Sequence, residues 1–255
     1  SLIFDTETTG LPKNYNAPLS DSDNWPRMVQ IAWQLHGVNG ELIEAKNYIV
    51  KPEGYTIPYS AEKVHGISTE RATNDGLDLE WVLNEFNSII QKTRFLVGHN
   101  ISFDINIVGA EFLRKNISST LSDIKVIDTK EESTDYCALP GGKGGKYKWP
   151  NLSELHIKLF GSAFDEAHNA SGDVAATARC FLELIRLEVV PYDKLGLDRS
   201  FIKSFKEVNP DIIPSIDIEI EKNRIETPIE DIKIEEPEHQ IKETKREAEN
   251  TSSFV

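Results

Sequence analysis

Two acidic residues at the end of an apolar run are the first in the chain with the types and spacing to do chemistry. The run Leu2–Phe4 is typical of a buried strand, and Asp5 and Glu7 follow it. Successive strand side chains point to opposite faces, so these two acids project from the same face. Neighbouring carboxylates repel each other unless a cation lies between them, and their hard oxygens suit Mg²⁺ or Mn²⁺. The pair is therefore a candidate metal site; the alternative is a strand that ends in a polar turn.

Two more acids and a histidine occur at comparable places later in the chain. Asp104 follows a short apolar run, and Asp173 opens a predicted helix with His168 on its approach. An acid in a first helical turn often only complements the helix dipole, which is the alternative for Asp104. Four carboxylates from separate elements can hold two divalent cations, which activate a water and stabilise the leaving 3′ oxygen of a phosphodiester. His168 can accept the proton of that water, since an unperturbed histidine titrates near neutral pH.

The elements predicted around these residues form an α/β domain. Apolar patterning predicts strands at 2–7, 28–36, 41–50, 94–98 and 124–128, with Asn39-Gly40 as the turn of a hairpin. Helical periodicity predicts helices at 60–64, 79–93, 102–115, 152–159 and 174–185, and further helical stretches starting at Ser68/Thr69 and within 193–212. Asn100 or Ser102 is expected to cap the helix that carries Asp104. The stretch 131–150 is expected to be rich in loop.

Composition divides the chain into two parts. The net charge is −14, and residues 188–255 hold 10 Lys and Arg against 17 Asp and Glu. We expect a folded domain over 1–187 and an acidic, low-complexity linker or tail over 188–255, partly disordered or partner-binding. Within this tail, Ile216, Ile218 and Ile220 alternate as in an added strand. The acidic balance disfavours a DNA-coating protein, but bound cations would let an enzyme hold a few nucleotides.

The remaining composition indicates a cytoplasmic protein without a membrane partner. No run of about 20 apolar residues is present, as a membrane-spanning helix would require. The two cysteines, Cys137 and Cys180, have no metal-type spacing and do not make a disulfide framework. A reducing compartment is therefore expected.

Two polar stretches each have two interpretations. His65 in the turn Val64-His65-Gly66-Ile67 is either a surface residue or a ring offered to a substrate base. The stretch 141–149 combines four glycines, three lysines and two aromatics, and lacks the spacing of a Walker A loop. It is either a grip for a phosphate backbone or a surface loop.

Three motifs together resemble a known family. They are the stretches 4–10 (Phe-Asp-Thr-Glu-Thr-Thr-Gly) and 98–104 (Gly-His-Asn-Ile-Ser-Phe-Asp), and His168 separated by four residues from Asp173. Over residues 2–187 the chain resembles the DEDDh group of 3′–5′ exonucleases, which have the ribonuclease H-like fold. Within that group it is most similar to the proofreading exonuclease of bacterial DNA polymerase III, the epsilon type, and to versions fused ahead of a polymerase alpha chain. The resemblance implies a mixed five-stranded sheet, three antiparallel strands followed by two parallel ones, flanked by helices.

The resemblance also implies roles for individual residues. It makes four acids the ligands of two Mg²⁺ or Mn²⁺ ions and His168 the general base; the acids are Asp5, Glu7, Asp104 and Asp173. The residues it implies for contact with the terminal nucleotide are Thr8, Thr9, His65, Asn100 and Phe103. The implied partners are a DNA 3′ end, single-stranded or frayed, and a replicative polymerase in cis or in trans.

Two other functions stay open at this point. The same chemistry would serve an exonuclease that trims RNA or small oligonucleotides. A function of another class is a non-catalytic module that docks a polymerase or a clamp through the acidic tail.

Overall fold

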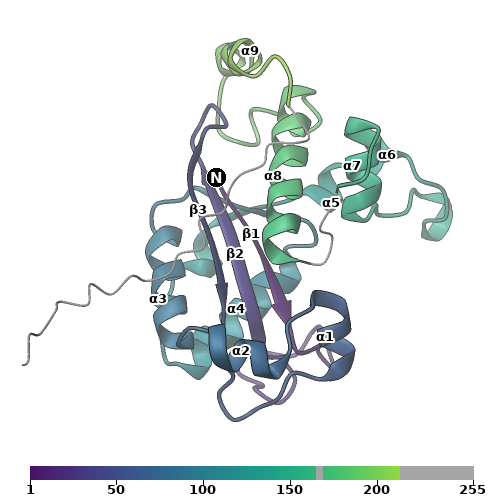
Figure 1. Ribbon diagram of the computed structural model, residues 1–255. Coiled ribbons are helices and arrows are strands. Elements are labelled where there is room, and N and C mark those ends of the chain that lie inside the picture. The colour runs from purple at the N-terminus through teal and green to yellow at the C-terminus, as the bar shows by residue number, and fades with distance from the viewer. Residues whose placement is uncertain (165–168, 213–255) are drawn as a thin grey trace, which may run out of the picture. The chain divides into compact units, whose positions relative to one another are not determined.

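A five-stranded mixed sheet forms the centre of the computed structural model, which describes residues 1–164 and 169–212 (Figure 1). The strand order is β3-β2-β1-β4-β5. The strands are β1 Leu2–Thr8, β2 Met28–His36, β3 Leu42–Ile49, β4 Phe95–Gly98 and β5 Lys125–Asp128. β1 and β3 pair antiparallel with β2, whereas β4 pairs parallel with β1 and with β5. The predicted fold class is therefore confirmed.

The two faces of β1 belong to two different hydrophobic clusters because its side chains alternate. Leu2 and Phe4 pack with helices α3 (Leu79–Ile90) and α4 (Ser102–Arg114). Ile3 points the other way and packs with helix α8 (Ala170–Arg186). Figure 1 shows α8 running alongside β1 and β2. The acids of β1 continue the face of Ile3, so the sequence pattern places them beside α8.

The other helices connect these layers. They are α1 Tyr59–His65, α2 Thr69–Asp75, α5 Thr129–Glu132, α6 Thr134–Cys137, α7 Leu152–Phe160 and α9 Arg199–Val208, with short 3₁₀ turns η1 Leu121–Asp123 and η2 Lys143–Gly145. None of the helices in the described ranges is both long and apolar enough to cross a membrane.

The sequence expectations for the local elements need two corrections. The helix expected over 79–93 ends at Ile90. The stretch 131–150 is rich in loop as expected, with α5 and α6 at its beginning. Neither Asn100 nor Ser102 caps α4: its N-cap is Ile101 without a side-chain bond. Asn100 instead adopts the left-handed backbone (φ 70°), and its N–H donates to Asp128 Oδ1 over 2.9 Å.

The packed part of the chain continues beyond residue 187. Val190, Leu195, Ile202 and Phe205 are buried in the same cluster as the apolar face of α8. The expected boundary between domain and tail thus falls inside a packed region, and the function of residues 188–255 stays a prediction. The expected strand at 216–220 lies outside the described residues.

Candidate active site

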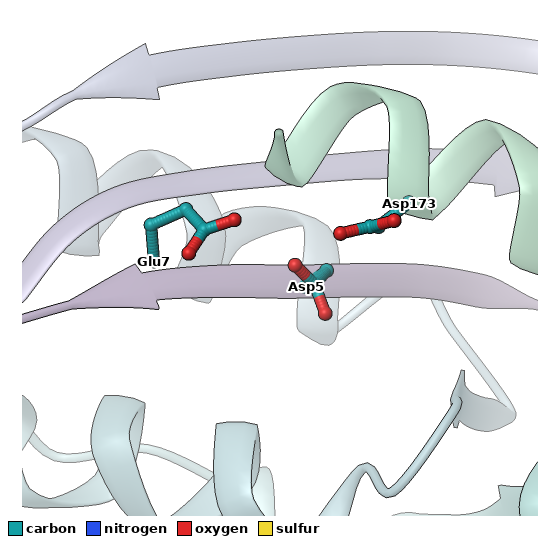
Figure 2. Close-up of side chains that lie close together, drawn as sticks. All are labelled: Asp5, Glu7 and Asp173. Carbon is teal, nitrogen blue, oxygen red and sulfur yellow. The ribbon is translucent and has the colours of Figure 1, made fainter. Parts of the chain in front are cut away.

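Three carboxylates meet at the end of β1. Asp5 and Glu7 project from β1, Asp173 comes from the first turn of α8, and the three side chains point toward one another (Figure 2). One oxygen from each lies within 4.8 Å of the others. All three are hard oxygen donors with partial access to solvent, so this donor set fits a hard divalent cation such as Mg²⁺ or Mn²⁺.

The local sequence explains how the three carboxylates come together. Asp5 lies opposite Ala32 of β2 in the strand register, and this small neighbour leaves room on the face beneath α8. Asn169 caps α8, because its Oδ1 accepts the N–H of Ser171 over 3.1 Å. The cap fixes where the helix starts, and Asp173 lies in its first turn, where the helix dipole favours a negative charge.

Asp104 is held by β1 in another way. Its Oδ1 accepts the backbone N–H of Thr6 over 2.9 Å and the Thr6 hydroxyl over 2.6 Å. The side chain of Thr6 points away from the face of Asp5 and Glu7 because neighbouring strand residues alternate. Asp104 is therefore not one of the three clustered carboxylates, although it is buried next to the same strand and its charge acts on both acids of β1.

The electrostatics of the site favour protons or cations. Burial raises the pKa of Asp5 well above its usual range, and the charges of Asp104, Asp173 and Glu7 raise it further. Burial, with the charges of Asp173 and Asp104, raises the pKa of Glu7 to about 8. Burial raises the pKa of Asp104 to about 7, although the bonds from Thr6 favour its charged form. Such shifts result when carboxylates are crowded together where water screens their charges poorly, and a divalent cation would offset the repulsion between them.

A cleft of about 270 Å³ opens beside the carboxylate cluster. Its lining combines Asp5 and Asp173 with a second residue of α8 and with side chains from three other places in the fold; these are Thr177, and His99, Asn151, Leu152, Ser153 and Phe164. β1, β4 and β5 run parallel, so their carboxyl ends lie at the same edge of the sheet. Ligands of such sheets bind outside this edge.

The two threonines expected at the terminal nucleotide are engaged in the turn after β1. The hydroxyl of Thr8 donates to the Gly10 carbonyl over 2.7 Å. The hydroxyl of Thr9 accepts the backbone N–H of Arg27 over 3.0 Å, and the N–H of Thr9 donates to the Arg27 carbonyl over 2.9 Å. Their hydroxyls therefore shape the turn that follows the metal ligands, and their contact with substrate stays a prediction.

The other expected substrate contacts lie on separate elements. His65 is the last residue of α1 and is 8% exposed. Burial lowers the pKa of its ring, and a hydrogen bond with the Thr8 backbone partly offsets this effect. Asn100 is exposed at the end of β4, and its Oδ1 accepts Lys130 Nζ over 2.6 Å. Phe103 is partly buried against the cluster beneath α4. His168, the expected general base, lies outside the described residues.

Two residues of the site were missed by the sequence analysis. His99 lines the cleft, and its ring contacts Thr129 Oγ1 at 3.0 Å and the Pro150 carbonyl at 2.9 Å. Thr6 holds Asp104, as described above. Both lie inside motifs that were recognised, and the position of His99 directly after a parallel strand was the available signal. The partner of Thr6 lies 98 residues away in the chain and has no local signal.

A family model described as exonuclease (RNase_T) matches residues 2–181 of this chain. The chain belongs to this exonuclease family. The predicted resemblance is thereby confirmed, and so is the prediction that the protein is an exonuclease. The carboxylate cluster lies within the matched residues.

Curated relatives of this exonuclease domain are much longer proteins. It is 31% identical over 186 residues to the PolC-type DNA polymerase III of Streptococcus thermophilus, an alignment that covers 72% of this chain and 11% of the relative. It is 28% identical over 222 residues to the PolC-type DNA polymerase III of Staphylococcus aureus, covering 82% of this chain and 13% of the relative. The chain thus spans little more than a tenth of the length of these relatives.

Solved structures share the fold. The exonuclease domain superposes on E. coli exonuclease I in complex with a dT13 oligonucleotide with a TM-score of 0.61 and 21% identity, over 80% of this chain and 45% of that one. A zinc-bound form of the E. coli exonuclease I–single-stranded DNA complex superposes with a TM-score of 0.57 and 22% identity, over 76% and 42% of the two chains. At this identity the likeness supports the fold alone.

Proposed function

We propose that this exonuclease domain removes nucleotides from the 3′ end of DNA in a reaction that depends on two divalent cations, and that it proofreads during replication. The observation that carries the proposal is the cluster of Asp5, Glu7 and Asp173, whose oxygens lie within 4.8 Å of one another beside a cleft. The raised pKa of Asp5 and of Glu7 supports a role in binding cations, because their buried, like-charged surroundings disfavour the charged form unless a cation is bound. The PolC-type DNA polymerase III relatives support DNA as the substrate.

Four carboxylates are proposed as the ligands of the cations. Asp5, Glu7 and Asp173 would hold the cations. Asp104, held by Thr6, contributes the fourth carboxylate. When bound, the two cations supply a nucleophilic water at neutral pH and stabilise charge on the leaving 3′ oxygen.

The remaining roles concern the proton and the nucleotide. His168 is expected to accept the proton of the water, and this assignment rests on the sequence. Thr8, Thr9, His65, Asn100 and Phe103 are proposed to hold the terminal nucleotide. His99 bonds the Pro150 carbonyl and Thr129 and so keeps the end of β4, α5 and the start of α7 in one arrangement around the cleft.

The test is a digestion of short single-stranded DNA carrying a 5′ label or a 3′ label, with Mg²⁺, with Mn²⁺ and with EDTA. A 3′–5′ exonuclease shortens the 5′-labelled strand in steps of one nucleotide and releases the 3′ label at once as a mononucleotide. Release of the 5′ label first would contradict the proposed direction. Digestion in EDTA at the rate seen with Mg²⁺ would contradict the dependence on cations.

Two more substrates test the biological role. A proofreading enzyme removes a mismatched primer terminus faster than a paired one, because the mismatched strand frays into the site. RNA of the same length separates proofreading from RNA trimming, and a strong preference for RNA would refute the proofreading role. The partnership with a polymerase, in cis or in trans through residues 188–255, is proposed from the PolC-type relatives and is tested by co-purification with a polymerase subunit.

A further inference from the structure

The segment between α6 and α7 exposes two large aromatic rings among lysines. Trp149 is 63% exposed and Tyr147 is 49% exposed. Lys143 and Lys146 flank them and are also exposed. Exposed large aromatic side chains that lie near one another commonly mark a binding surface, because burying them against a partner contributes strongly to affinity. We call Lys130, Lys143, Lys146, Tyr147 and Trp149 the lysine–aromatic platform.

The platform is built on a closed loop. The backbone N–H of Lys148 donates to the Leu139 carbonyl over 2.9 Å and joins the two arms of the loop. Gly142 lies where any Cβ would come within 2.3 Å of the Tyr147 carbonyl oxygen, so the arms approach too closely for a side chain. Lys148 Nζ also binds Glu154 of α7 over 2.6 Å. The loop therefore has a defined stem that presents its aromatics.

The platform continues directly into the wall of the cleft. Pro150 follows Trp149, and its carbonyl contacts His99 Nε2 at 2.9 Å. The next residues, 151–153, line the cleft together with Asp5 and Asp173. Lys130 Nζ lies over the Trp149 ring, 4.4 Å from its centroid. The same ammonium donates to Asn100 Oδ1, which connects the platform to the second motif.

The charge of the platform contrasts with the rest of the chain. The sequence carries a net charge of −14, and the cleft itself is built from acids. Lys148 and Lys194 are paired with Glu154 and Glu132. Within residues 1–164 and 169–212, neither Lys143 nor Lys146 forms an ion pair. A polyanion that enters the acidic cleft would thus find cations immediately outside it.

We propose that the lysine–aromatic platform binds the nucleotides that precede the 3′-terminal one in a single-stranded nucleic acid. Bases stack on Trp149 and Tyr147, and the lysines contact the phosphates between them, as proteins that bind single strands without sequence preference do. This surface explains how an acidic exonuclease holds its substrate, and it rests on the proposed function only for the direction of the strand.

Binding without hydrolysis tests the platform. Fluorescence anisotropy in EDTA measures the affinity of labelled oligo-dT as a dinucleotide and as a longer strand. The wild type should bind the longer strand more tightly than the dinucleotide. We expect Trp149→Ala to reduce the ratio of these two affinities by about tenfold, the effect of losing one stacked base. We expect Lys143→Ala with Lys146→Ala to lower the slope of log affinity against log salt by about 0.7 for each lost phosphate contact.

Matched variants control for general effects of the substitutions. Trp81→Ala removes a partly exposed tryptophan from α3, and Lys203→Ala removes an exposed lysine from α9. Both should keep the wild-type length and salt dependence. An unchanged length dependence in Trp149→Ala, or an equal loss for both strand lengths, would overturn the platform.

The outcomes also separate this inference from the proposed function. If the wild type binds the longer strand in EDTA but does not hydrolyse it with Mg²⁺ or Mn²⁺, the proposed function fails and the platform stands. If it hydrolyses the strand and Trp149→Ala behaves like the wild type, only the platform fails. If the wild type binds neither length in EDTA but hydrolyses the strand with Mg²⁺ or Mn²⁺, the platform fails and the proposed function stands.

Discussion

Glu111 and Asp5 are carboxylates with little solvent exposure in the same domain, and the charges around them have opposite signs. The side chain of Glu111 in α4 is 0% exposed, and its Oε1 accepts Arg27 Nε and the Met28 N–H, each over 2.9 Å. Arg114 Nη1 lies 3.2 Å from the same oxygen. The charges that act on Asp5, in contrast, come from Asp104, Asp173 and Glu7.

The difference separates a carboxylate that stabilises the fold from the carboxylates that we propose for the reaction. Glu111 joins α4 to the chain entering β2, and the protein itself supplies the neutralising cations. Asp5 lies among like charges, an arrangement that destabilises the metal-free fold and that a bound cation reverses. A buried acid whose neighbours are arginines is thus structural, and one whose neighbours are acids is a candidate for function.

The largest effect is expected for Asp5→Asn. Removing this proposed cation ligand should reduce the rate of digestion of single-stranded DNA by roughly a thousandfold, about 4 kcal/mol of transition-state stabilisation. The melting temperature of the metal-free protein should stay the same or rise, because one of the repelling charges is gone. Digestion assays together with thermal unfolding in EDTA measure both. Full activity in the variant would contradict the assigned site.

Glu111→Gln should show the opposite pattern. The change leaves Arg27 and Arg114 without their buried counter-charge, and it should cost about 3 kcal/mol of unfolding free energy. The rate per folded molecule should stay near the wild-type value, since Glu111 does not line the cleft. Urea unfolding and digestion assays provide the comparison.

Asp75→Asn is the matched control for Glu111→Gln. Its pair with Arg71 spans 3.8 Å between two exposed side chains, so its loss should cost under about 1 kcal/mol. If both variants lose the same stability, the contrast between buried and exposed pairs is wrong.

The sequence predicted the antiparallel strands and the common face of Asp5 and Glu7 because both depend on short-range signals. The apolar runs of β1 and β2 and the turn at Asn39-Gly40 specify the antiparallel hairpin order. The alternation of Asp5 and Glu7 specifies their common face. These features follow from the period of a strand, and no distant residue is needed to derive them.

The features that escaped prediction depend on contacts between distant residues. The hydrogen bonds that hold Asp104 were not predicted, because their donor Thr6 lies 98 residues earlier in the chain. Asn100 was expected to cap a helix, and Asp128 holds its backbone instead. Glu111 showed no signal at all, because a buried glutamate reads as a surface residue of a helix until its arginines are located.

Metal binding should produce the next largest change in stability. A ligand that binds only the folded state at 100 times its dissociation constant stabilises it by about 2.7 kcal/mol. Mg²⁺ or Mn²⁺ should therefore raise the melting temperature of the wild type and of Asp75→Asn. Asp173→Asn should lose this gain, since one of the three clustered ligands is removed. An equal rise in Asp173→Asn would place the cation elsewhere.

The smallest effect concerns the pH dependence of the metal-free protein. The pKa of Glu7 is raised to about 8 and that of Asp104 to about 7, so the folded state holds protons that the unfolded state releases. Stability from these groups is complete below the unfolded values and is lost as the pH rises through the folded ones. We expect the unfolding free energy in EDTA to fall by about 1 kcal/mol between about pH 5 and about pH 8, a small amount because solvent screens the partly exposed Glu7.

Glu7→Gln should flatten this pH profile, whereas Asp75→Asn should keep it. Saturating Mg²⁺ should reverse its sign in the wild type, because the cation binds the deprotonated carboxylates and rising pH then favours the folded state. If the stability of the metal-free wild type rises with pH over this range, the carboxylates of β1 are already neutralised by the protein, and they belong with Glu111 rather than with a metal centre.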